Sequence, residues 1–253
     1  MTETTDTRSS ARERIIEAAA GLLDEGGRAA VTTRGVAVRA GVQAPAIYRL
    51  FGDKDGLLDA VAEHVMASFA AVKTAAVAAA TDADPVEDLR RGWEVTIDFG
   101  VANSALFALL ADPARGQRSP AAQAGIRLLA ERVHRVALAG RLQVGEDKAV
   151  ELIHAAGIGA ILTILARPGP GGQRDRRLAE VMLEATLDQI LTPPDSALKA
   201  TADDDISGAV AHAVALRAQT ARFRALSARE QALLAEWLDR IINSENPTHV
   251  PRT

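Results

Sequence analysis

The stretch TRGVAVRAGVQAPAIYRLF, residues 33–51, decides the fold class of this chain. It divides into two short helical segments around Gly41-Val42-Gln43, a tight turn in which Gly41 can adopt the positive φ that is needed. Pro45 falls in the first turn of the second segment, where its missing N–H has no intrahelical partner anyway. Ile47 and Phe51 lie four residues apart and are predicted to face inward, which leaves Ala44, Ala46, Tyr48 and Arg49 toward solvent. The pattern predicts a helix-turn-helix over about residues 33–52, whose second helix would enter a DNA major groove.

Helical periodicity continues on both sides of this stretch. Residues 1–9 are polar and are expected to be unstructured, and the capping box Ser10-x-x-Glu13 predicts the first helix start. Gly26-Gly27 should end that helix, and Thr32 or Thr33 should cap the next one. A longer helix is predicted from Asp53 to about residue 80. Residues 11–71 should therefore form an N-terminal three-helix DNA-binding domain of helix-turn-helix type and the helix that leaves it.

The remainder reads as a larger helical domain over 72–200 and a C-terminal helical extension over 201–245. Asp84-Pro85-Val-Glu87 is a strong helix start, and Asp112-Pro113, residues 167–172 and Pro193-Pro194 are breaks. Helices are predicted at 119–140, 146–166 and 173–191, and two more after Asp203–Asp205. The last of them opens with a second capping box, Ser227-x-x-Glu230. No segment alternates like a strand, so the sequence predicts an all-α protein of about ten or eleven helices.

Composition excludes several classes of site. Hydrophobic residues make up 48% and charged residues 25% of the 253, which is typical of a soluble globular protein. There is no cysteine, and no two histidines lie three or four residues apart, so neither thiolate nor helical His-pair metal sites are expected. No paired carboxylates or nucleophile elbow indicate an enzyme. No signal peptide or uncharged run long enough to span a membrane is present, and we expect a cytoplasmic protein without cofactor or membrane contact.

Charge is distributed unevenly along the chain. The net charge is -4, yet residues 27–54 hold five basic side chains (Arg28, Arg34, Arg39, Arg49 and Lys54) and a single acid, Asp53. A basic segment on an acidic body favours a local phosphate-facing surface, although an ordinary solvated face explains the charge alone equally well.

Residues 15–69 resemble the DNA-binding domain of the TetR (tetracycline-repressor) family of transcriptional regulators. The matching runs are Ile15-Ile-x-Ala18-Ala19, Leu22-Leu23, Val31-Thr-Thr-Arg34, Ala40-Gly41-Val42 and Ile47-Tyr48-x-x-Phe51-x-x-Lys54-x-x-Leu57-Leu58. The resemblance implies a ligand-responsive, sequence-specific DNA-binding regulator, commonly a homodimeric repressor that a small apolar effector releases from a palindromic operator.

The resemblance also implies residue roles in DNA binding. Thr33, Tyr48 and Lys54 would contact backbone phosphates, and Arg34 would read a guanine through O6 and N7. Pro45 and Ala46 would touch thymine methyl groups, and Arg49 would reach bases or phosphates in the same groove. Gln43 and Ala44 complete the candidate set, but Ala44 replaces a longer polar residue of the family and is expected to read little.

The body carries no motif, so its site residues are chosen from helical spacing. An apolar cavity between helices is expected for the effector. The residues predicted to lie near it are Trp93, Ile97, Val101, Phe107, Leu110, His134, Leu138, His154 and Ile158. Gly157-x-Gly159 would allow another helix to approach closely, which resembles a dimer interface formed in the family by helices at the positions of 146–166 and 173–191.

Three alternatives stay open beside the repressor. An activator or dual regulator of the same family would share every feature above. A helical interaction protein acting through residues 205–243, independent of DNA, would make the basic segment incidental. The start of the last helix, residues 226–230, is also similar to that of LuxR-type DNA-binding domains, but only 23 residues follow it. We expect that helix to be too apolar for a free tail and to pack on the body or across the dimer, covering the cavity or enlarging the interface.

Overall fold

The structure, a computed structural model, describes residues 3–79, 84–110, 119–167, 175–192 and 206–243. The predicted breaks at Asp112-Pro113 and Pro193-Pro194 and most of those at 167–172 and 201–205 lie outside these residues. The described chain is all-α, as the periodicity predicted. Its helices are α1 (Glu3–Ala30), α2 (Thr33–Ala40), α3 (Ala44–Phe51), α4 (Lys54–Ala79), α5 (Pro85–Ala102), α6 (Ser104–Leu110), α8 (Pro120–Leu138), α9 (Glu146–Ala166), α10 (Arg177–Ile190), α11 (Ile206–Gln219) and α12 (Ala228–Asn243), with a short 3₁₀ helix at Thr220–Arg222.

The N-terminal helix is longer than predicted. α1 already runs at Glu3, so Ser10 lies inside it and does not cap it; the Ser10 hydroxyl instead accepts a long hydrogen bond from Arg14, one turn later. The predicted stop is correct, because Gly26 and Gly27 leave the helical region, with φ of 65° at Gly27. Such a positive φ is open to glycine at little cost.

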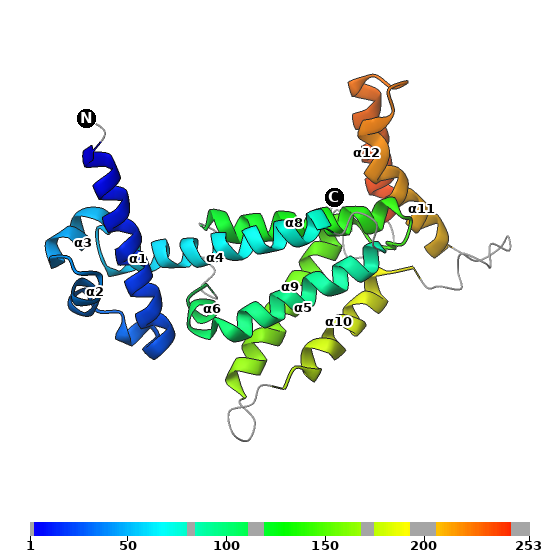
Figure 1. Ribbon diagram of the computed structural model, residues 1–253. Helices are drawn as coiled ribbons and strands as arrows, with labels where there is room; N and C mark the ends of the chain where they lie inside the picture. Colours follow the sequence, from blue (N-terminus) through cyan, green and yellow to red (C-terminus); the bar gives the residue numbers. More distant parts are fainter. Residues whose placement is uncertain (1–2, 80–83, 111–118, 168–174, 193–205, 244–253) are drawn as a thin grey trace, which may run out of the picture.

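Helices α1 to α4 enclose the first of two apolar clusters, which we call the DNA-domain cluster. Its fully buried side chains include Ile15, Val31, Val36, Leu58 and Val61. One buried member, Leu106, comes from α6, so the first domain also packs against the body. Figure 1 shows this domain at one end of the molecule, with α4 extending from it toward the other helices. The predicted domain boundary at residue 71 therefore falls inside a continuous helix.

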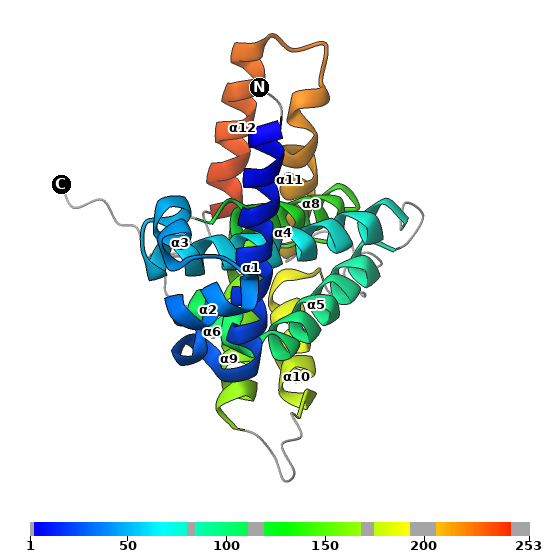
Figure 2. The ribbon, with the colours of Figure 1, turned by 60° about the vertical axis from the view of Figure 1, so that its left-hand side comes forward.

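The body is built around α9, which packs against α5, α8 and α10 (Figures 1 and 2). Asp84 caps α5 by accepting from the N–H groups of Val86 (2.9 Å) and Glu87 (3.1 Å), as its position before Pro85 predicted. Ser119 caps α8 in the same way. The second apolar cluster, the body cluster, centres on side chains such as Leu89, Val133, Ile161 and Leu187. α9 is long and apolar enough by composition to cross a membrane, but in this fold it is a core helix of the body.

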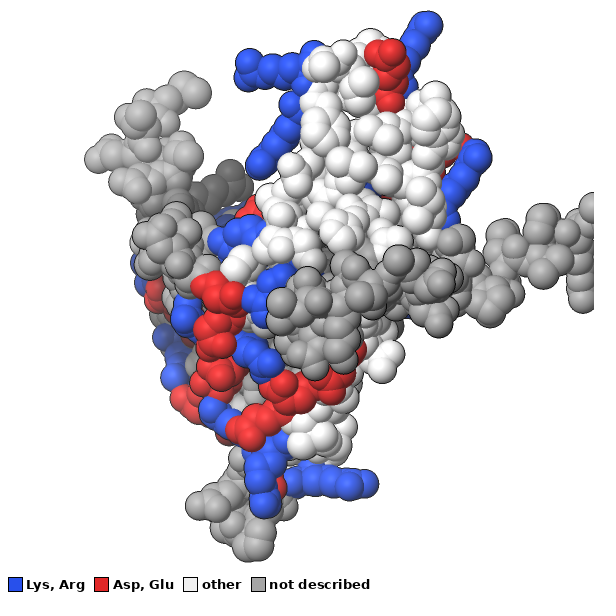
Figure 3. Space-filling view, turned by 90° about the vertical axis from the view of Figure 1, so that its right-hand side faces the viewer, with Lys and Arg blue, Asp and Glu red and all other residues white. Residues whose placement is uncertain are grey.

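The C-terminal extension forms a hairpin at the end of the molecule opposite the first domain (Figure 1). α11 packs on α8 and contributes Val210 and Val214 to the body cluster, and the Ser227–Glu230 capping box starts α12 as predicted. Only part of the apolar set of α12 is buried within the protomer. Leu238 is buried and Leu234 half-buried, whereas Leu233, Trp237 and Ile241 lie on the neighbouring face at a spacing of four and are exposed. The face shown in Figure 3 is largely uncharged over this hairpin and carries interleaved acids and bases below it.

Candidate functional site

The turn between α2 and α3 has the geometry that the sequence predicted. Gly41 adopts φ 65° and ψ 39°, and the N–H of Val42 donates to the carbonyl of Ala37 at 3.0 Å. Val42 packs against the DNA-domain cluster, which joins the turn to the core. Thr32, rather than Thr33, caps α2 by accepting from the N–H of Gly35 at 3.0 Å. These contacts fix the direction in which α3 leaves the domain.

The outer face of α3 carries most of the predicted contact residues. Gln43, Pro45, Tyr48 and Arg49 are exposed, with 55% of Tyr48 accessible, whereas Ile47 is buried at 2%. Ala44 and Ala46 are half-buried, and Ala44 packs against the DNA-domain cluster, so its predicted solvent-facing position is wrong. The reason is that Ala44, Ile47 and Phe51 are three and four residues apart and share one helical face.

Four of the five basic residues of 27–54 are arginines, and two of these form no ion pair with a described residue. Arg28 pairs with Asp55 at 2.9 Å and Arg39 with Glu25 at 2.7 Å. Arg34 and Arg49 are exposed and have no such partner. Their charges are therefore available to phosphates or base edges, which are the roles that the resemblance implies for them.

Lys54 stands at the start of α4, beside the end of α1. Its Nζ donates to the backbone carbonyl of Arg28 at 3.1 Å, and no carboxylate in the described part of the chain forms an ion pair with it. The preceding Asp53 accepts from the N–H of Gly56 at 2.8 Å and so caps α4. Thr33, half-buried at the start of α2, lies in the other short helix of the motif.

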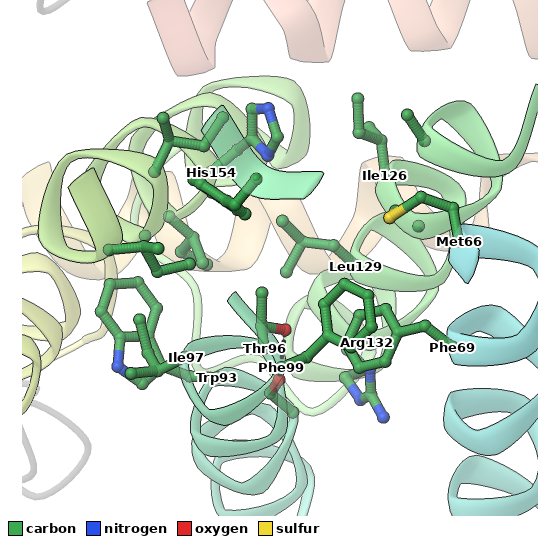
Figure 4. A pocket seen from close by; sticks show the side chains of 18 of the residues that line it. Met66, Phe69, Trp93, Thr96, Ile97, Phe99, Ile126, Leu129, Arg132 and His154 are labelled. Atoms are coloured by element: carbon green, nitrogen blue, oxygen red, sulfur yellow. Dashed lines mark hydrogen bonds between the residues drawn. The ribbon is translucent and has the colours of Figure 1, made fainter. Parts of the chain in front are cut away.

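A cavity of about 620 Å³ lies in the body, between α4, α5, α6, α8 and α9. This volume falls within the range of small-molecule sites. Figure 4 shows Met66 and Phe69 of α4 on one side of it and His154 of α9 on another. Phe69 stacks on Phe99 of α5, with ring centroids 3.7 Å apart. The lining residues are Met66, Phe69, Leu89, Gly92, Trp93, Thr96, Ile97, Phe99, Phe107, Ala122, Gln123, Gly125, Ile126, Leu129, Arg132, Ile153, His154, Gly157, Ile158 and Ile161.

Five of the predicted pocket residues border this cavity: Trp93, Ile97, Phe107, His154 and Ile158. Three do not. Val101 is buried in the body cluster one turn beyond Ile97, and Leu138 lies almost two turns beyond Arg132, the last residue of α8 to reach the cavity. His134 faces Glu146, whose carboxylate lies 3.0 Å from its Nδ1. The side chain of Leu110 lies outside the described part.

The sequence reasoning missed the contributions of α4 and α8. On α8 the lining positions Ala122, Ile126 and Leu129 follow helical spacing, but an identical pattern describes any core helix. A stronger signal was available in two charged residues, Asp88 and Arg132, which fall on otherwise apolar helical faces. Both are buried, and Arg132 Nε donates to Asp88 Oδ2 at 3.1 Å.

The two glycines predicted to lie at a dimer interface face side chains of the same protomer. A Cβ at Gly157 would lie 3.4 Å from the Trp93 ring, and one at Gly159 would lie 3.8 Å from Cε of Met182 in α10. Exposed apolar side chains do occur on the other faces of these helices, at Leu162 of α9 and at Leu178 and Val181 of α10. Across the described residues, no cluster of three or more His, Asp or Glu side chains has an arrangement that could hold a metal ion.

The N-terminal domain is similar in sequence to known proteins. Residues 15–61 match the family model described as bacterial regulatory proteins, tetR family. This match identifies residues 15–61 as a DNA-binding domain of the TetR type. Over 76 residues, 30% of the chain, it is 40% identical to the HTH-type transcriptional regulator BetI of Burkholderia mallei. Over 53 residues, 21% of the chain, it is 51% identical to the class A tetracycline repressor protein from transposon 1721 of Escherichia coli.

These alignments cover 39% of BetI and 24% of the tetracycline repressor. Similarity of fold extends further. A TetR family transcription regulator from Marinobacter aquaeolei covers 76% of the chain with all of its own length, at a TM-score of 0.52 and 19% identity. FadR from Bacillus subtilis, solved in complex with stearoyl-CoA, covers 70% of the chain with 95% of its own length, at a TM-score of 0.53 and 16% identity. TetR-family proteins are DNA-binding regulators and not enzymes.

Proposed function

We propose that this protein is a homodimeric, ligand-responsive transcriptional repressor that binds an inverted-repeat operator and is released when an apolar effector fills the body cavity. The observation that carries this proposal is the course of α4. The helix begins at Lys54, beside the predicted DNA contacts, and presents Met66 and Phe69 to the cavity. Lys54 and Phe69 are about 22 Å apart along a continuous helix, at about 1.5 Å per residue.

A ligand that displaces Phe69 would therefore act directly on the element that carries the DNA-binding domain. Phe69 stacks on Phe99, and Phe99 in turn packs against the DNA-domain cluster together with Leu106. Ligand binding would favour a conformation whose two recognition helices no longer fit successive major grooves, and the affinity for DNA would fall accordingly. Repression is the direction that we propose; activation requires the opposite preference between the two conformations.

DNA binding is tested by fluorescence anisotropy on the sequence upstream of the gene, with two variants that change charge equally. Arg34→Ala removes a guanidinium without an ion pair, and we expect it to cost about 1–3 kcal/mol and to relax selectivity at one base pair. Arg39→Ala, on the same helix, removes a guanidinium that pairs with Glu25 and lies over Gly21, so it should bind nearly as the parent does. If site selection returned the same consensus for Arg34→Ala as for the parent, the assignment of Arg34 to a base would be rejected.

Dimerisation is proposed through α9 and α10, because one short recognition helix contacts too few bases for high specificity. The support is the exposed apolar set Leu162, Leu178 and Val181, of which Val181 is 66% exposed. Light scattering on Val181→Asp should show a monomer, whereas Leu216→Asp on α11, also an exposed apolar position, should leave the dimer intact. A parent protein that is monomeric at micromolar concentration, both alone and with DNA, would contradict the proposal.

The alternative of a helical interaction protein that acts independently of DNA makes a different prediction. Such a protein would bind operator and random DNA equally weakly, and Arg34→Ala and Arg39→Ala would behave alike. A reporter gene under the upstream sequence separates repressor from activator, since expression rises on deletion of a repressor and falls on deletion of an activator.

A further inference from the structure

Arg132 stands apart from the other residues that line the cavity. Of the described residues that border the cavity, Arg132 is the one with a permanent charge, and none of them is a lysine, an aspartate or a glutamate. Only 5% of Arg132 is exposed, and the polar neighbours in the lining are Thr96, Gln123 and His154. The wall of this otherwise apolar cavity is therefore positively charged at one place. Figure 4 places Arg132 next to the Phe69–Phe99 pair, beside α5.

The carboxylate that pairs with Arg132 lies outside the lining and is shared. Asp88 Oδ2 accepts from Nε of Arg132 at 3.1 Å and also from Nη2 of Arg135. Two guanidinium groups thus meet one carboxylate, and the cluster keeps a formal charge of +1. Nη1 and Nη2 of Arg132 donate no hydrogen bond to any described residue. These Nη groups are not among the fully buried side-chain atoms without a partner, so they keep access to solvent, and an acceptor supplied by a ligand could replace water there.

The space for this guanidinium depends on Gly92 of α5. A Cβ at residue 92 would lie 2.9 Å from both Cζ and Nε of Arg132 and 3.0 Å from its Nη1. Glycine lowers the stability of a helix interior. At residue 92 this cost is accompanied by space for the guanidinium of Arg132, which a larger side chain would occupy. The position of Arg132 is consequently built by three side-chain choices on two helices: Asp88, Gly92 and Arg132 itself.

We propose that the effector carries a carboxylate on an apolar body, and that Arg132 binds this carboxylate through its free Nη groups. The inference rests on the proposed function in one respect, that the cavity is the effector site. Guanidinium binds carboxylate through short, charge-assisted and commonly bidentate hydrogen bonds. The apolar body would lie among Trp93, Ile126 and Leu129, and its burial would supply most of the affinity.

Trp93 provides a direct measurement of binding. The chain has two tryptophans, and Trp237 is exposed on α12, so Trp237→Phe leaves Trp93 in the cavity wall as the sole tryptophan, whose emission is followed. In this full-length background, decanoate is compared with decanol and decylamine, and naphthoate with naphthol. We expect each carboxylate to bind at least about tenfold more tightly than its neutral or cationic counterpart. In Arg132→Met, whose linear side chain fills similar space, the carboxylate and the alcohol should bind equally well.

Two further variants separate a loss of recognition from a loss of fold. Arg135→Met removes the other guanidinium on Asp88, but Arg135 does not line the cavity, so the preference for carboxylates should persist. Arg132→Lys keeps the charge without the planar fork and should retain part of the preference, which keeps the test decisive if Arg132→Met does not fold. Circular dichroism of each variant gives the fold independently.

The inference is overturned if carboxylates bind no better than alcohols, if none of the carboxylates binds, or if the preference survives in Arg132→Met. Operator release is measured separately with the same compounds. Release by decanol or naphthol, with no advantage for the acids, would support the proposed function and overturn the carboxylate assignment. Tight carboxylate binding, measured at Trp93, without any release of the operator would support the carboxylate assignment and overturn the proposed function.

Discussion

The two apolar clusters of this protein are built from helices of the same kind, yet one is filled and the other encloses a hollow. The DNA-domain cluster holds Ile15, Val31, Val36, Leu58 and Val61 at complete burial between α1, α2, α3 and the start of α4. The body cluster buries side chains along α9 and α10 but borders a cavity of about 620 Å³ between α4, α5, α6, α8 and α9.

The difference fits the tasks that we propose for the two regions. A recognition helix must be held in a fixed direction, and close packing provides this because a filled core resists deformation. A ligand site must instead offer space and have walls that move when it is filled. Phe99 belongs to both regions, since it borders the cavity and packs against the DNA-domain cluster. A change in the hollow cluster can therefore reach the filled one through side-chain contact.

The largest expected effect follows from deletion of residues 200–253. α11 contributes Val210 and Val214 to the body cluster, and a buried valine contributes about 1.5–3 kcal/mol, so the body should lose several kcal/mol of stability. No described side chain of α11 or α12 belongs to the DNA-domain cluster, and the hairpin is at the other end of the molecule. Thermal unfolding should shift strongly downward, while binding to the operator at low temperature is retained.

Two adjacent residues of α12 give the matched control for this deletion. Leu238→Ala removes a side chain that is 6% exposed, and Trp237→Ala removes one that is 52% exposed, so the first should destabilise the protein more. A deletion that keeps the parent's stability but abolishes DNA binding would contradict this account and favour a second DNA-binding module in the hairpin.

A smaller effect distinguishes the filled cluster from the hollow one directly. Leu58→Ala leaves a void in a closed core and should cost about 2–5 kcal/mol in urea unfolding. Leu129 is half-buried and borders a cavity that is already open. Leu129→Ala should therefore lower the free energy of unfolding by about 1 kcal/mol, since only part of the transfer free energy of the side chain is lost. Equal costs would mean that the cavity closes in solution, and the comparison would fail.

Sequence reasoning succeeded where local chemistry decides the structure. The turn at Gly41, the proline in α3, the caps at Asp84 and Ser227 and the bounds of α9 all depend on a few neighbouring residues, and the structure has them as predicted. Ser10 failed as a cap for a related reason. The capping-box pattern is local and weak, and nothing in the preceding residues prevents the helix from beginning earlier.

The cavity could be predicted only in part, because it depends on how helices far apart in sequence are paired. Trp93, Ile97 and His154 were found from spacing along their own helices, whereas Met66 and Phe69 had been assigned to the helix leaving the first domain. His134, placed near the cavity by the same spacing, instead pairs with Glu146, and both side chains are partly exposed at the surface. Spacing tells which residues share a face and leaves open what that face meets.

An intermediate effect tests the helix start that opens the body. The backbone N–H of Glu87, which donates to Asp84, lowers the pKa of Asp84 below its ordinary value; slight desolvation opposes this shift, and the charge of Arg141, 2.5 Å away, adds to it. A lowered pKa in the folded state stabilises the protein above the unfolded-state pKa, and this contribution disappears as pH falls through the folded value.

Asp84→Ala should therefore cost about 1 kcal/mol at neutral pH, a typical value for a lost N-cap. Asp84→Asn keeps the capping acceptor and should cost less. In thermal unfolding at a series of pH values, the gap between parent and Asp84→Ala should stay constant from neutrality to about pH 4 and narrow only below it. A gap that narrows above pH 5 would show that Asp84 is not the group responsible.

The smallest expected effect adds a single methyl group to the hollow or to the filled part of the body. Gly157 borders the cavity, and a Cβ there would lie 3.4 Å from the Trp93 ring, an ordinary contact. Gly157→Ala should therefore raise stability by about 0.5–1 kcal/mol, because alanine favours the helix and the methyl group fills apolar space.

At Gly100 of α5 a Cβ would lie 2.6 Å from Cδ1 and 2.9 Å from Cγ2 of Ile161, so the same substitution overlaps a packed side chain. In Gly100→Ala this overlap should outweigh the stabilisation that alanine gives to the helix, and the unfolding temperature should fall. Stabilisation by both substitutions would mean that the packing around Ile161 yields as readily as the cavity wall, and the distinction between filled and hollow regions would then not hold within the body.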